Sequence, residues 1–421
     1  MFYEVKPAEN FKCTVSVPGS KSITNRALII GALAGSGTIL NNFLYSDDTV
    51  YMLEALRGLG YRISDDKDAG TVIIHNPAQA TLKGSCFVGN SGTAIRFLAS
   101  FCAAAGCEVE LTGIERMKER PIGELAEALK ALGAEIAFKE KEGFPPIRIK
   151  SNGLEGGKVS IRGDISSQFI TSLLLSAPYA KNDIEIEIQG ELVSKPYVDI
   201  TIQMMKDFGV EVKNYNYKHF LIKAGQSYTP REYTIESDCS SASYFFAAAA
   251  IANGDVTVEN INPKSLQGDI KFVDILEEMG AMVERGDNYI RVIGKELKGI
   301  TIDMQNTSDV AQTLAVAALF AEGPTEIKNV YNMRLKETDR LRAVANELVK
   351  LGAGVEEKKD GITIYPASSY KAAEIETYDD HRMAMSFTLA GLKIPGIRIA
   401  NPGCVSKTFP QYFNEFQKIY G

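Results

Sequence analysis

Val17-Pro18-Gly19-Ser20-Lys21-Ser22-Ile23-Thr24-Asn25-Arg26 precedes a run rich in Ala and Leu, so this polar segment opens a predicted helix. Backbone N–H groups and the positive dipole end favour phosphate or carboxylate at a helix N-terminus. Lys21, Ser22 and Arg26 would add charged and bidentate donors. The stretch therefore predicts an anion-binding helix start.

The same motif has two competing interpretations. A nucleoside-triphosphate loop requires Gly directly before the Lys and a second Gly five residues earlier. Ser20 and Val15 occupy those positions, which argues against such a loop. A solvated cationic helix start is an equally good interpretation of the motif on its own.

Length and composition bound the class of protein. A chain of 421 residues with 45% hydrophobic residues is expected to form two or more domains, each with its own core. Its 46 Lys and Arg against 53 Asp and Glu give a net charge of −7. This charge argues against a broad nucleic-acid surface but leaves room for a locally positive cleft.

Cysteine usage and the N-terminal sequence indicate the compartment. The six cysteines form no Cys-x-x-Cys pair and stand beside only three histidines, so neither a disulfide framework nor a zinc site is expected. The N-terminal residues show no signal or transit character, and no stretch has the length of a membrane span. We therefore expect a cytoplasmic protein without a membrane partner.

One pattern of elements recurs with a period of about 70 residues. Each copy opens with a polar cap before a helical stretch of small apolar residues. A short β-rich run and a second, amphipathic helix ending in Gly follow. The six caps lie at residues 20–22, 90–93, 166–168, 239–241, 307–309 and 379–382.

This alternation of helices and strands predicts an α/β fold of two domains with three units each. The inserted domain is expected at residues 19–237 and the other at 1–18 plus 238–421. If the N-terminal strand before Pro18 pairs with the C-terminal half, the chain crosses between domains near 15–20 and 226–238. A cleft between two such domains would collect helix N-termini from both.

Further cations stand near expected helix starts. Arg120 comes immediately before Pro121, which suits the first turn of a helix, and Lys407 precedes an apolar helical run. Arg96 lies about one turn inside the helix that begins near Gly92, on an otherwise apolar face, and is interpreted as structural. Since runs of charge are usually solvated faces, these residues count only as parts of a repeated pattern.

Residues 334–342 form the densest charged cluster of the sequence. Lys336 and Arg340 are expected on one helical face at i, i+4. An exposed, ion-paired helix is the alternative interpretation. Glu337 is flanked by cations, so a role as general acid requires burial that favours its protonated form.

Two further carboxylate positions also have alternative interpretations. Asp309 is expected at the N-cap of an Ala-rich helix, where capping alone would explain it. Residues 379–382 suggest metal ligands, but no second His is near and Arg382 would repel a cation.

Cations from separate segments could together bind a substrate pair with several negative charges. They are Lys21, Arg26, Arg120, Lys336, Arg340, Arg382 and Lys407.

Eight motifs occur in order: Pro18-Gly19-Ser20-Lys21-Ser22-x-x-Asn25-Arg26, Gly89-Asn90-x-Gly92-Thr93, Met117-Lys118-Glu119-Arg120-Pro121, Ser166-Ser167-Gln168-Phe169, Val193-Ser194-Lys195-Pro196-Tyr197, Lys336-Glu337-Thr338-Asp339-Arg340, Asp380-His381-Arg382-Met383 and Lys407-Thr408-Phe409-Pro410. Through them the chain resembles the 5-enolpyruvylshikimate-3-phosphate synthase family of enolpyruvyl transferases over essentially its whole length. Such an ordered set is highly specific.

The resemblance implies two inside-out α/β domains, each of three β-α-β-α-β-β units, with the active site in the interdomain cleft. It also implies transfer of the enolpyruvyl group of phosphoenolpyruvate to the 5-hydroxyl of shikimate 3-phosphate through a tetrahedral intermediate, without metal or organic cofactor. By residue match, shikimate 3-phosphate would be held by Lys21, Ser22, Arg26, Ser166, Ser167, Gln168, Ser194, Asp309, Asn332 and Lys336. Phosphoenolpyruvate would be held by Lys21, Asn90, Gly92, Arg120, Gln168, Arg340, Arg382 and Lys407.

The resemblance also assigns roles in catalysis and inhibition. Asp309 would be the base for the 5-hydroxyl, Glu337 the acid that protonates the methylene carbon, and Lys21 would share in proton transfer. Glyphosate would compete with phosphoenolpyruvate, because Gly92 has no side chain to crowd the donor pocket. Phe97 departs from the family, which commonly has Pro there. A monomer with only small-molecule partners is expected.

Two alternatives to this assignment are a sister enzyme with the same fold and donor and, from a different class, a non-catalytic protein. The enolpyruvyl transferase that acts on UDP-N-acetylglucosamine expects a loop Cys near the donor site, whereas residues 117–121 contain none. A non-catalytic sugar-phosphate-binding protein would need the cations but neither Asp309 nor Glu337.

Overall fold

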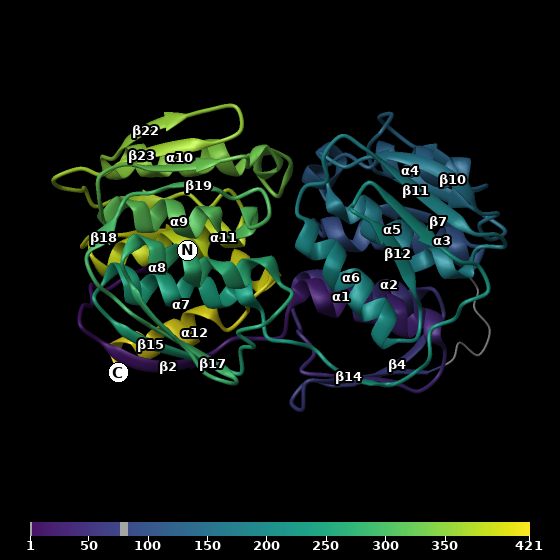
Figure 1. The fold of residues 1–421 in the computed structure, drawn as a ribbon, viewed down its shortest axis with the longest axis horizontal. Helices are drawn as coiled ribbons and strands as arrows, with labels where there is room; N and C mark the ends of the chain where they lie inside the picture. Colours follow the sequence, from purple (N-terminus) through teal and green to yellow (C-terminus); the bar gives the residue numbers. More distant parts are fainter. Residues whose placement is uncertain (1, 76–82) are drawn as a thin grey trace. The chain divides into compact units, whose positions relative to one another are not determined.

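The computed structural model describes residues 2–75 and 83–421 of the chain. They form two compact units (Figure 1). Unit 1 comprises the residues up to Pro18 together with Ser237–Gly421, and unit 2 comprises Gly19–Glu236. Unit 2 is thus an insertion in the sequence of unit 1, and the chain passes twice from one unit to the other.

The described residues of unit 2 form three sheets with one topology: β14-β3-β5-β4, β6-β7-β9-β8 and β10-β11-β13-β12. In each, the first strand is parallel to the second and the other neighbours are antiparallel. β14 comes from the far end of the unit and pairs through Tyr233 with Leu40. The strands are β3 (Thr38–Asn41), β4 (Arg62–Asp66), β5 (Thr71–His75), β6 (Lys83–Phe87), β7 (Glu108–Thr112), β8 (Glu135–Phe138), β9 (Ile147–Lys150), β10 (Gly157–Arg162), β11 (Ile184–Gln189), β12 (Val212–Tyr215), β13 (His219–Ile222) and β14 (Glu232–Thr234).

Three helices, α1, α3 and α5, provide the interior of unit 2. Their residues are small or apolar on almost every side, which suits a helix without a solvated face. Leu28, Leu98 and Leu174, one from each, are fully buried. The helices are α1 (Lys21–Ala34), α2 (Asp47–Gly58), α3 (Gly92–Ala105), α4 (Gly123–Ala131), α5 (Ser167–Ser176) and α6 (Lys195–Asp207), with 3-10 turns η1 (Glu115–Glu119) and η2 (Ala177–Tyr179).

Unit 1 repeats this topology in β2-β15-β17-β16 and β19-β21-β23-β22. The N-terminal strand β2 lies parallel to β15, with Val15 opposite Val258, so the start of the chain completes a sheet of the C-terminal half. The third sheet has only three strands, β1-β25-β24, together with a separate β18-β20 pair. The strands are β1 (Phe2–Glu4), β2 (Lys12–Ser16), β15 (Asp255–Glu259), β16 (Met282–Arg285), β17 (Tyr289–Ile293), β18 (Leu297–Lys298), β19 (Thr301–Asp303), β20 (Ala321–Glu322), β21 (Thr325–Lys328), β22 (Gly354–Glu357), β23 (Ile362–Tyr365), β24 (Glu374–Ile375) and β25 (Arg398–Ala400).

In unit 1 the interior helices are α7, α9 and α11, which Figure 1 shows between the β2 sheet and the β22–β23 strands. All their residues are buried. The helices are α7 (Cys239–Ile251), α8 (Phe272–Met279), α9 (Ala311–Ala317), α10 (Arg340–Leu351), α11 (His381–Thr388) and α12 (Tyr412–Phe416). The 3-10 turns are η3 (Gly268–Lys271), η4 (Ser308–Val310), η5 (Ala318–Phe320), η6 (Tyr331–Leu335), η7 (Leu389–Leu392), η8 (Pro402–Lys407) and η9 (Gln417–Tyr420).

The repeated caps and glycine ends predicted from the sequence have a physical basis in the structure. The side chains of Ser91, Ser166 and Asp380 accept hydrogen bonds from the first turns of α3, α5 and α11. The cap of α7 lies one residue earlier than expected, at Asp238. The C-cap of α10 is Gly352, whose φ of 104° places it in the left-handed region that favours glycine. The α/β class is confirmed, and the sixth repeat is shorter than the others.

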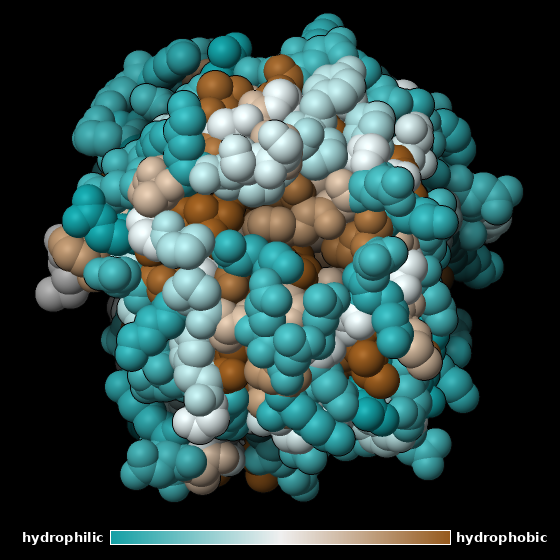
Figure 2. All heavy atoms as spheres, turned by 90° about the vertical axis from the view of Figure 1, so that its left-hand side faces the viewer, coloured by the Kyte–Doolittle hydropathy of each residue, from teal (hydrophilic) through white to brown (hydrophobic). Residues whose placement is uncertain are grey.

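The face of unit 1 that Figure 2 shows is mostly hydrophilic, with apolar residues gathered in a band across its middle. In the sheet strands of this unit, alternate side chains of β15 and β17 are buried in the core. Each unit thus places its sheets outside and its apolar helices inside.

Replacing Val15 with Ala should lower the free energy of unfolding by about 2 kcal/mol, because Val15 is 1% exposed and its methyl groups fill the core of unit 1. Thr14→Ala is the matched control on the same strand, since Thr14 is exposed. Urea denaturation followed by circular dichroism measures both variants. Equal stability of the two would mean that β2 is not an integral strand of this core.

Candidate active site

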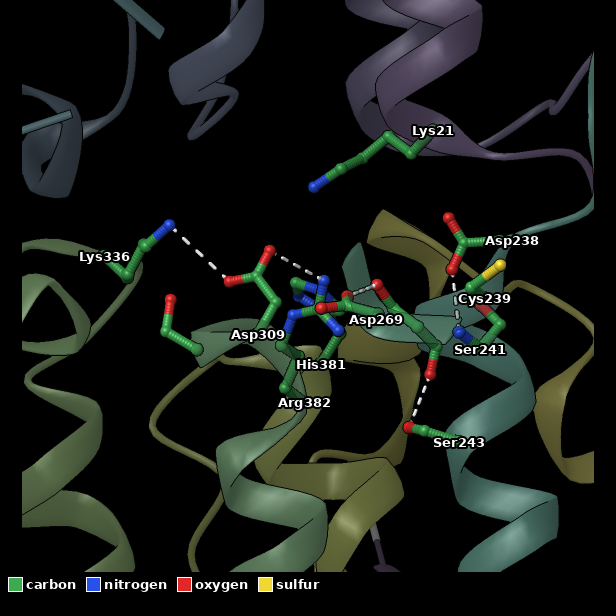
Figure 3. Close-up of polar contacts among 12 residues, drawn as sticks. Lys21, Asp238, Cys239, Ser241, Ser243, Asp269, Asp309, Lys336, His381 and Arg382 are labelled. Carbon is green, nitrogen blue, oxygen red and sulfur yellow. Dashed lines mark hydrogen bonds and ion pairs between the residues drawn. The ribbon is translucent and has the colours of Figure 1, made fainter. Parts of the chain in front are cut away.

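Asp309 is the carboxylate on which several cations of unit 1 converge. It lies in η4, and the expectation that it caps the next helix is wrong, because Val310 is the N-cap of α9. Its Oδ1 lies 3.5 Å from Nζ of Lys336 and 3.3 Å from Nη1 of Arg340. Its Oδ2 accepts a hydrogen bond from Nη2 of Arg382 at 3.1 Å (Figure 3). Three separate segments therefore direct positive charge at one carboxylate.

Arg340 is the first residue of α10, and 2% of its side chain is exposed. Its Nε donates to Oδ2 of Asp380 at 2.7 Å, and its Nη2 donates to Oε2 of Glu337 at 2.8 Å. Burial by itself would lower the pKa of Arg340, but the carboxylates of Asp380, Glu337 and Asp309 raise it above its ordinary value. Arg340 is therefore a fixed positive charge in the interior.

Lys336 lies outside α10, because it follows η6 with an extended backbone. The expectation that Lys336 and Arg340 share a helical face is wrong, although both cations contact Asp309. Removal from water lowers the pKa of Lys336 in spite of the attraction of Asp309. Asn332 in η6 donates to Oγ of Ser308 at 3.0 Å, so this predicted ligand lies beside the Asp309 turn.

Glu337 is 8% exposed and lies between two cations of unit 1. Besides its hydrogen bond from Arg340, its Oε1 is 3.9 Å from Nζ of Lys407. Lys407 is the last residue of η8, ahead of α12. The structure supplies the burial that a general acid requires, but it also supplies charges that favour the carboxylate form.

In unit 2, Lys21 is the first residue of α1, where the sequence predicted it. Its Nζ lies 3.3 Å from Oδ2 of Asp48, which is 2% exposed in the first turn of α2. The backbone carbonyl of Ser22 accepts a hydrogen bond from Nη1 of Arg26 at 2.7 Å. The ammonium group of Lys21 is thereby held at the start of a buried helix.

Arg26 is 2% exposed and is held by protein atoms of unit 2. Its Nε donates to Oγ1 of Thr201 at 2.9 Å, and its Nη2 donates to Thr171 and to the carbonyl of Tyr197. Its guanidinium also lies 5.3 Å from the ring centre of Phe97. Burial lowers the pKa of Arg26 to about 10. With the bond to Ser22, four of its five N–H groups are used by described residues.

Gln168, predicted to contact both substrates, is oriented by two neighbours in unit 2. Nη1 of Arg96 donates to Oε1 of Gln168 at 2.7 Å, and Nε2 of Gln168 donates to Oγ1 of Thr93 at 3.2 Å. Arg96 is 3% exposed and also donates to the carbonyl of Pro121. Arg96 is therefore structural, as interpreted from the sequence, but it also fixes a candidate site residue.

Arg120, Asn90 and Gly92 lie together in unit 2. Nη1 of Arg120 donates to the carbonyl of Asn90 at 2.8 Å and to its Oδ1 at 3.2 Å. Since α4 begins at Gly123, Arg120 does not lie immediately before the helix start, which corrects the sequence prediction. A Cβ atom at Gly92 would lie 2.4 Å from Nη2 of Arg120. The guanidinium therefore occupies space that is open only because residue 92 has no side chain.

The predicted serine ligands all lie at helix starts of unit 2. Oγ of Ser166 accepts a hydrogen bond from the backbone N–H of Gln168 at 3.3 Å, and Ser167 is the first residue of α5. Ser194 is the N-cap of α6 with a φ of 55°. These hydroxyls and the nearby N–H groups suit an anionic or hydroxylated ligand.

Several residues of these clusters were not recognised as site residues in the sequence. Asp48, Asp380 and Arg96 hold Lys21, Arg340 and Gln168 respectively. Two Asp residues in series at a helix start are ordinary, so Asp48 carried no distinct signal. Tyr244, whose hydroxyl accepts from Arg382 at 3.4 Å, lies in an apolar helical run.

Across 2–75 and 83–421, His, Cys, Asp and Glu side chains form no group of three that could hold a metal ion. Residues 379–382 instead contribute the Asp380 cap and the Arg382 contact to Asp309. Within the same ranges, no helix has the length and apolar character needed to cross a bilayer.

The repeated α/β units and the clusters of buried cations and carboxylates define a class, an α/β protein with sites suited to anionic ligands. Comparison with known proteins then gives the family. Residues 5–416 match the family described as EPSP synthase (3-phosphoshikimate 1-carboxyvinyltransferase). The chain belongs to this EPSP synthase family.

Named relatives and solved structures agree with this assignment. The chain is 50% identical to a 3-phosphoshikimate 1-carboxyvinyltransferase of Shewanella halifaxensis, over 99% of this chain and 98% of that protein. It is 52% identical to that of Histophilus somni, with the same coverage. An EPSP synthase structure from Acinetobacter baumannii matches with a TM-score of 0.81 and 29% identity, over 99% of this chain and 98% of that one.

Replacing Asp380 with Asn should cost about 3–5 kcal/mol of stability, because it leaves the buried Arg340 guanidinium without its principal carboxylate partner. Asp379→Asn is the neighbouring control. Asp379 is exposed and has a φ of 53°, a conformation that Asn adopts readily. Thermal unfolding should separate the two variants clearly. Similar melting temperatures would show that Asp380 does not neutralise Arg340.

Proposed function

We propose that this chain carries out the reaction of its family with the charged residues described above. That reaction transfers the enolpyruvyl group of phosphoenolpyruvate to the 5-hydroxyl of shikimate 3-phosphate and releases phosphate. The observation that supports the residue assignment best is the convergence of Lys336, Arg340 and Arg382 on Asp309. It combines a carboxylate base with cations suited to phosphate and carboxylate groups.

Substrate binding is assigned to polar groups of both units. The residues assigned to shikimate 3-phosphate are Lys21, Ser22, Arg26, Ser166, Ser167, Gln168, Ser194, Asp309, Asn332 and Lys336. The residues assigned to phosphoenolpyruvate are Lys21, Asn90, Gly92, Arg120, Gln168, Arg340, Arg382 and Lys407. Because Arg26 already donates four hydrogen bonds to protein atoms, it contributes at most one bond and mainly stabilises the Ser22 segment.

Asp309 is the base that takes the proton of the 5-hydroxyl. Its three cationic neighbours favour the charged carboxylate, which is the form that accepts a proton. The same contacts fix the direction of the carboxylate, so orientation adds to charge in lowering the barrier.

Glu337 is the acid that protonates the methylene carbon of phosphoenolpyruvate. In the described structure it is paired with Arg340 and Lys407, which opposes protonation. Both cations are assigned to phosphoenolpyruvate, whose negative groups would take over their charge. Glu337 then loses its counter-charges while remaining buried, so its protonated form gains stability. Donor binding thereby prepares the acid.

Lys21 shares in proton transfer and offsets negative charge as the tetrahedral intermediate forms. Its contact with Asp48 directs the ammonium group before substrate arrives. Charge stabilisation by preorganised cations supplies most of the acceleration in such a site, because these groups need not reorient during the reaction.

Asp309→Asn should lower kcat by about 10²–10⁴-fold, the usual contribution of a general base, while calorimetry still detects binding of shikimate 3-phosphate. Glu337→Gln should cause a loss of similar size, because the amide cannot deliver the proton. Phosphate release from phosphoenolpyruvate in the presence of shikimate 3-phosphate measures both.

Asp303→Asn is the control for these variants, since Asp303 is exposed and lies six residues from Asp309. It should keep the unaltered rate. Full activity of Asp309→Asn would refute its role as base. A protein that binds shikimate 3-phosphate but never releases phosphate would instead be the sugar-phosphate-binding alternative.

Glyphosate should inhibit this enzyme in competition with phosphoenolpyruvate. Gly92→Ala should raise the inhibition constant about tenfold, or ~1.4 kcal/mol. The new Cβ would lie 2.4 Å from Arg120 and 2.7 Å from Arg96, so both guanidinium groups must move. Steady-state kinetics with varied glyphosate and phosphoenolpyruvate measures the change.

Gly58→Ala is the matched control, because the added Cβ would meet no described atom within 4 Å apart from its chain neighbours and the backbone of its own helix. An enzyme that is uninhibited at high glyphosate, or a Gly92→Ala variant as sensitive as Gly58→Ala, would overturn this assignment. We further propose that the protein is a monomer and that it lies in the cytoplasm. The six free cysteines support the second point, because they fit a reducing compartment.

A further inference from the structure

Asp269 is a buried carboxyl group that the assigned mechanism does not use. It lies in η3 and is 4% exposed. Its Oδ2 accepts a short hydrogen bond from Oγ of Ser240, whereas its Oδ1 is buried with no hydrogen-bond partner among the described residues (Figure 3). Leaving a buried carboxylate oxygen without a donor is costly, so this group is expected to carry a proton more readily than an exposed Asp.

The surroundings of Asp269 connect it to the Asp309 cluster. Three charged side chains act on Asp269. They are Asp309 in η4, Arg382 in α11 and Asp238 at the N-cap of α7. Figure 3 places Asp269 beside Arg382 and His381 on the side of Arg382 away from Lys336. Lys271 on the same turn is exposed and α8 begins with buried apolar residues. Asp269 thus faces the candidate site and not solvent.

The balance of charge in this part of unit 1 depends on one proton. Four cations, Lys336, Arg340, Arg382 and Lys407, meet three paired carboxylates, Asp309, Glu337 and Asp380. With Asp269 protonated, the group carries a net charge of 4 − 3 = +1. With Asp269 ionised, the net charge is zero, and the attraction for an anionic substrate is weaker.

We propose that Asp269 is a positioning residue that sets the charge of the Asp309–Arg382 pair by holding or releasing a single proton. Protonated Asp269 leaves the positive charge of Arg382 available to phosphoenolpyruvate. Ionised Asp269 competes with the substrate for Arg382 and repels Asp309. The kinetic part of this inference rests on the proposed function, whereas the protonation of Asp269 does not.

Burial first, and then the neighbouring Asp309 carboxylate, raise the pKa of Asp269 to about 7 against the opposing effects of Arg382 and the Ser240 hydrogen bond. The transition therefore falls near neutral pH. The unfolded chain has an Asp with an ordinary pKa near 4. Between these values the folded protein binds the extra proton, so stability declines as pH rises toward 8 and then levels off.

The first test compares Asp269→Asn with the natural chain between pH 6 and 8.5. The amide imitates the protonated carboxyl group at every pH. The ratio of the natural KM for phosphoenolpyruvate to that of the variant should be near one at pH 6 and rise about three- to tenfold by pH 8.5. Taking this ratio cancels the titration of the substrate itself. Asp274→Asn is the control, with an exposed carboxylate on α8, and should follow the natural profile.

The second variant, Ser240→Ala, tests the direction of the pH effect while Asp269 itself stays unchanged. It removes the hydrogen bond that favours the carboxylate form. The kinetic transition should therefore move to higher pH, by roughly half a unit. A purely structural role of Asp269 predicts no shift, and a shift to lower pH would contradict the proposal.

Thermal unfolding across the same pH range tests the proton independently of catalysis. The melting temperature of the natural chain should fall from pH 6 to 8, whereas that of Asp269→Asn should fall clearly less. Parallel melting curves would overturn the proposal, whatever the enzyme catalyses. A weaker pH dependence of the melting temperature in Asp269→Asn, without a change in KM, would support the buried proton. It would refute the influence of that proton on substrate binding. Should Asp269→Asn not fold, the Ser240→Ala profiles decide the question.

Discussion

The buried guanidinium of Arg340 is the interaction on which the unit 1 site depends. A charge removed from water needs opposite charges and hydrogen bonds in good geometry. Asp380 supplies them from the N-cap of α11, Glu337 from the residues before α10, and Asp309 from η4. Because one group binds three carboxylates, it fixes the relative positions of Asp309, Glu337 and the helix cap Asp380. The site is therefore preorganised by a structural ion cluster.

Arg26 in unit 2 shows a second way to bury a guanidinium. Its partners are hydroxyls and carbonyls, and its flat faces lie near the rings of Phe97 and Tyr197. Without a carboxylate partner, burial lowers its pKa, whereas the pKa of Arg340 is raised. Arg26 serves as a scaffold for the Lys21 segment, and Arg340 is assigned to the chemistry.

Much of the fold could be predicted from local patterns in the sequence. Small, apolar helical runs after polar caps indicate buried helices, and Gly after a Leu-rich helix indicates a left-handed end. Lys21, Ser166 and Gly352 therefore lie where the sequence placed them. The same local reasoning failed for Asp309 and Lys336, because both lie in or after 3-10 turns that periodicity does not reveal.

By itself, then, the sequence determined the repeats, the buried helices and the anionic character of the ligands, since these follow from residue type and spacing. Only the tertiary structure decided which charges meet. Arg382 reaches Asp309 across 73 residues, and Arg340 reaches Asp380 across 40. The partners Asp48 and Asp269 are ordinary carboxylates until the fold removes them from water. Burial gives an ion pair or an isolated carboxyl group its effect, and burial is a property of the whole fold.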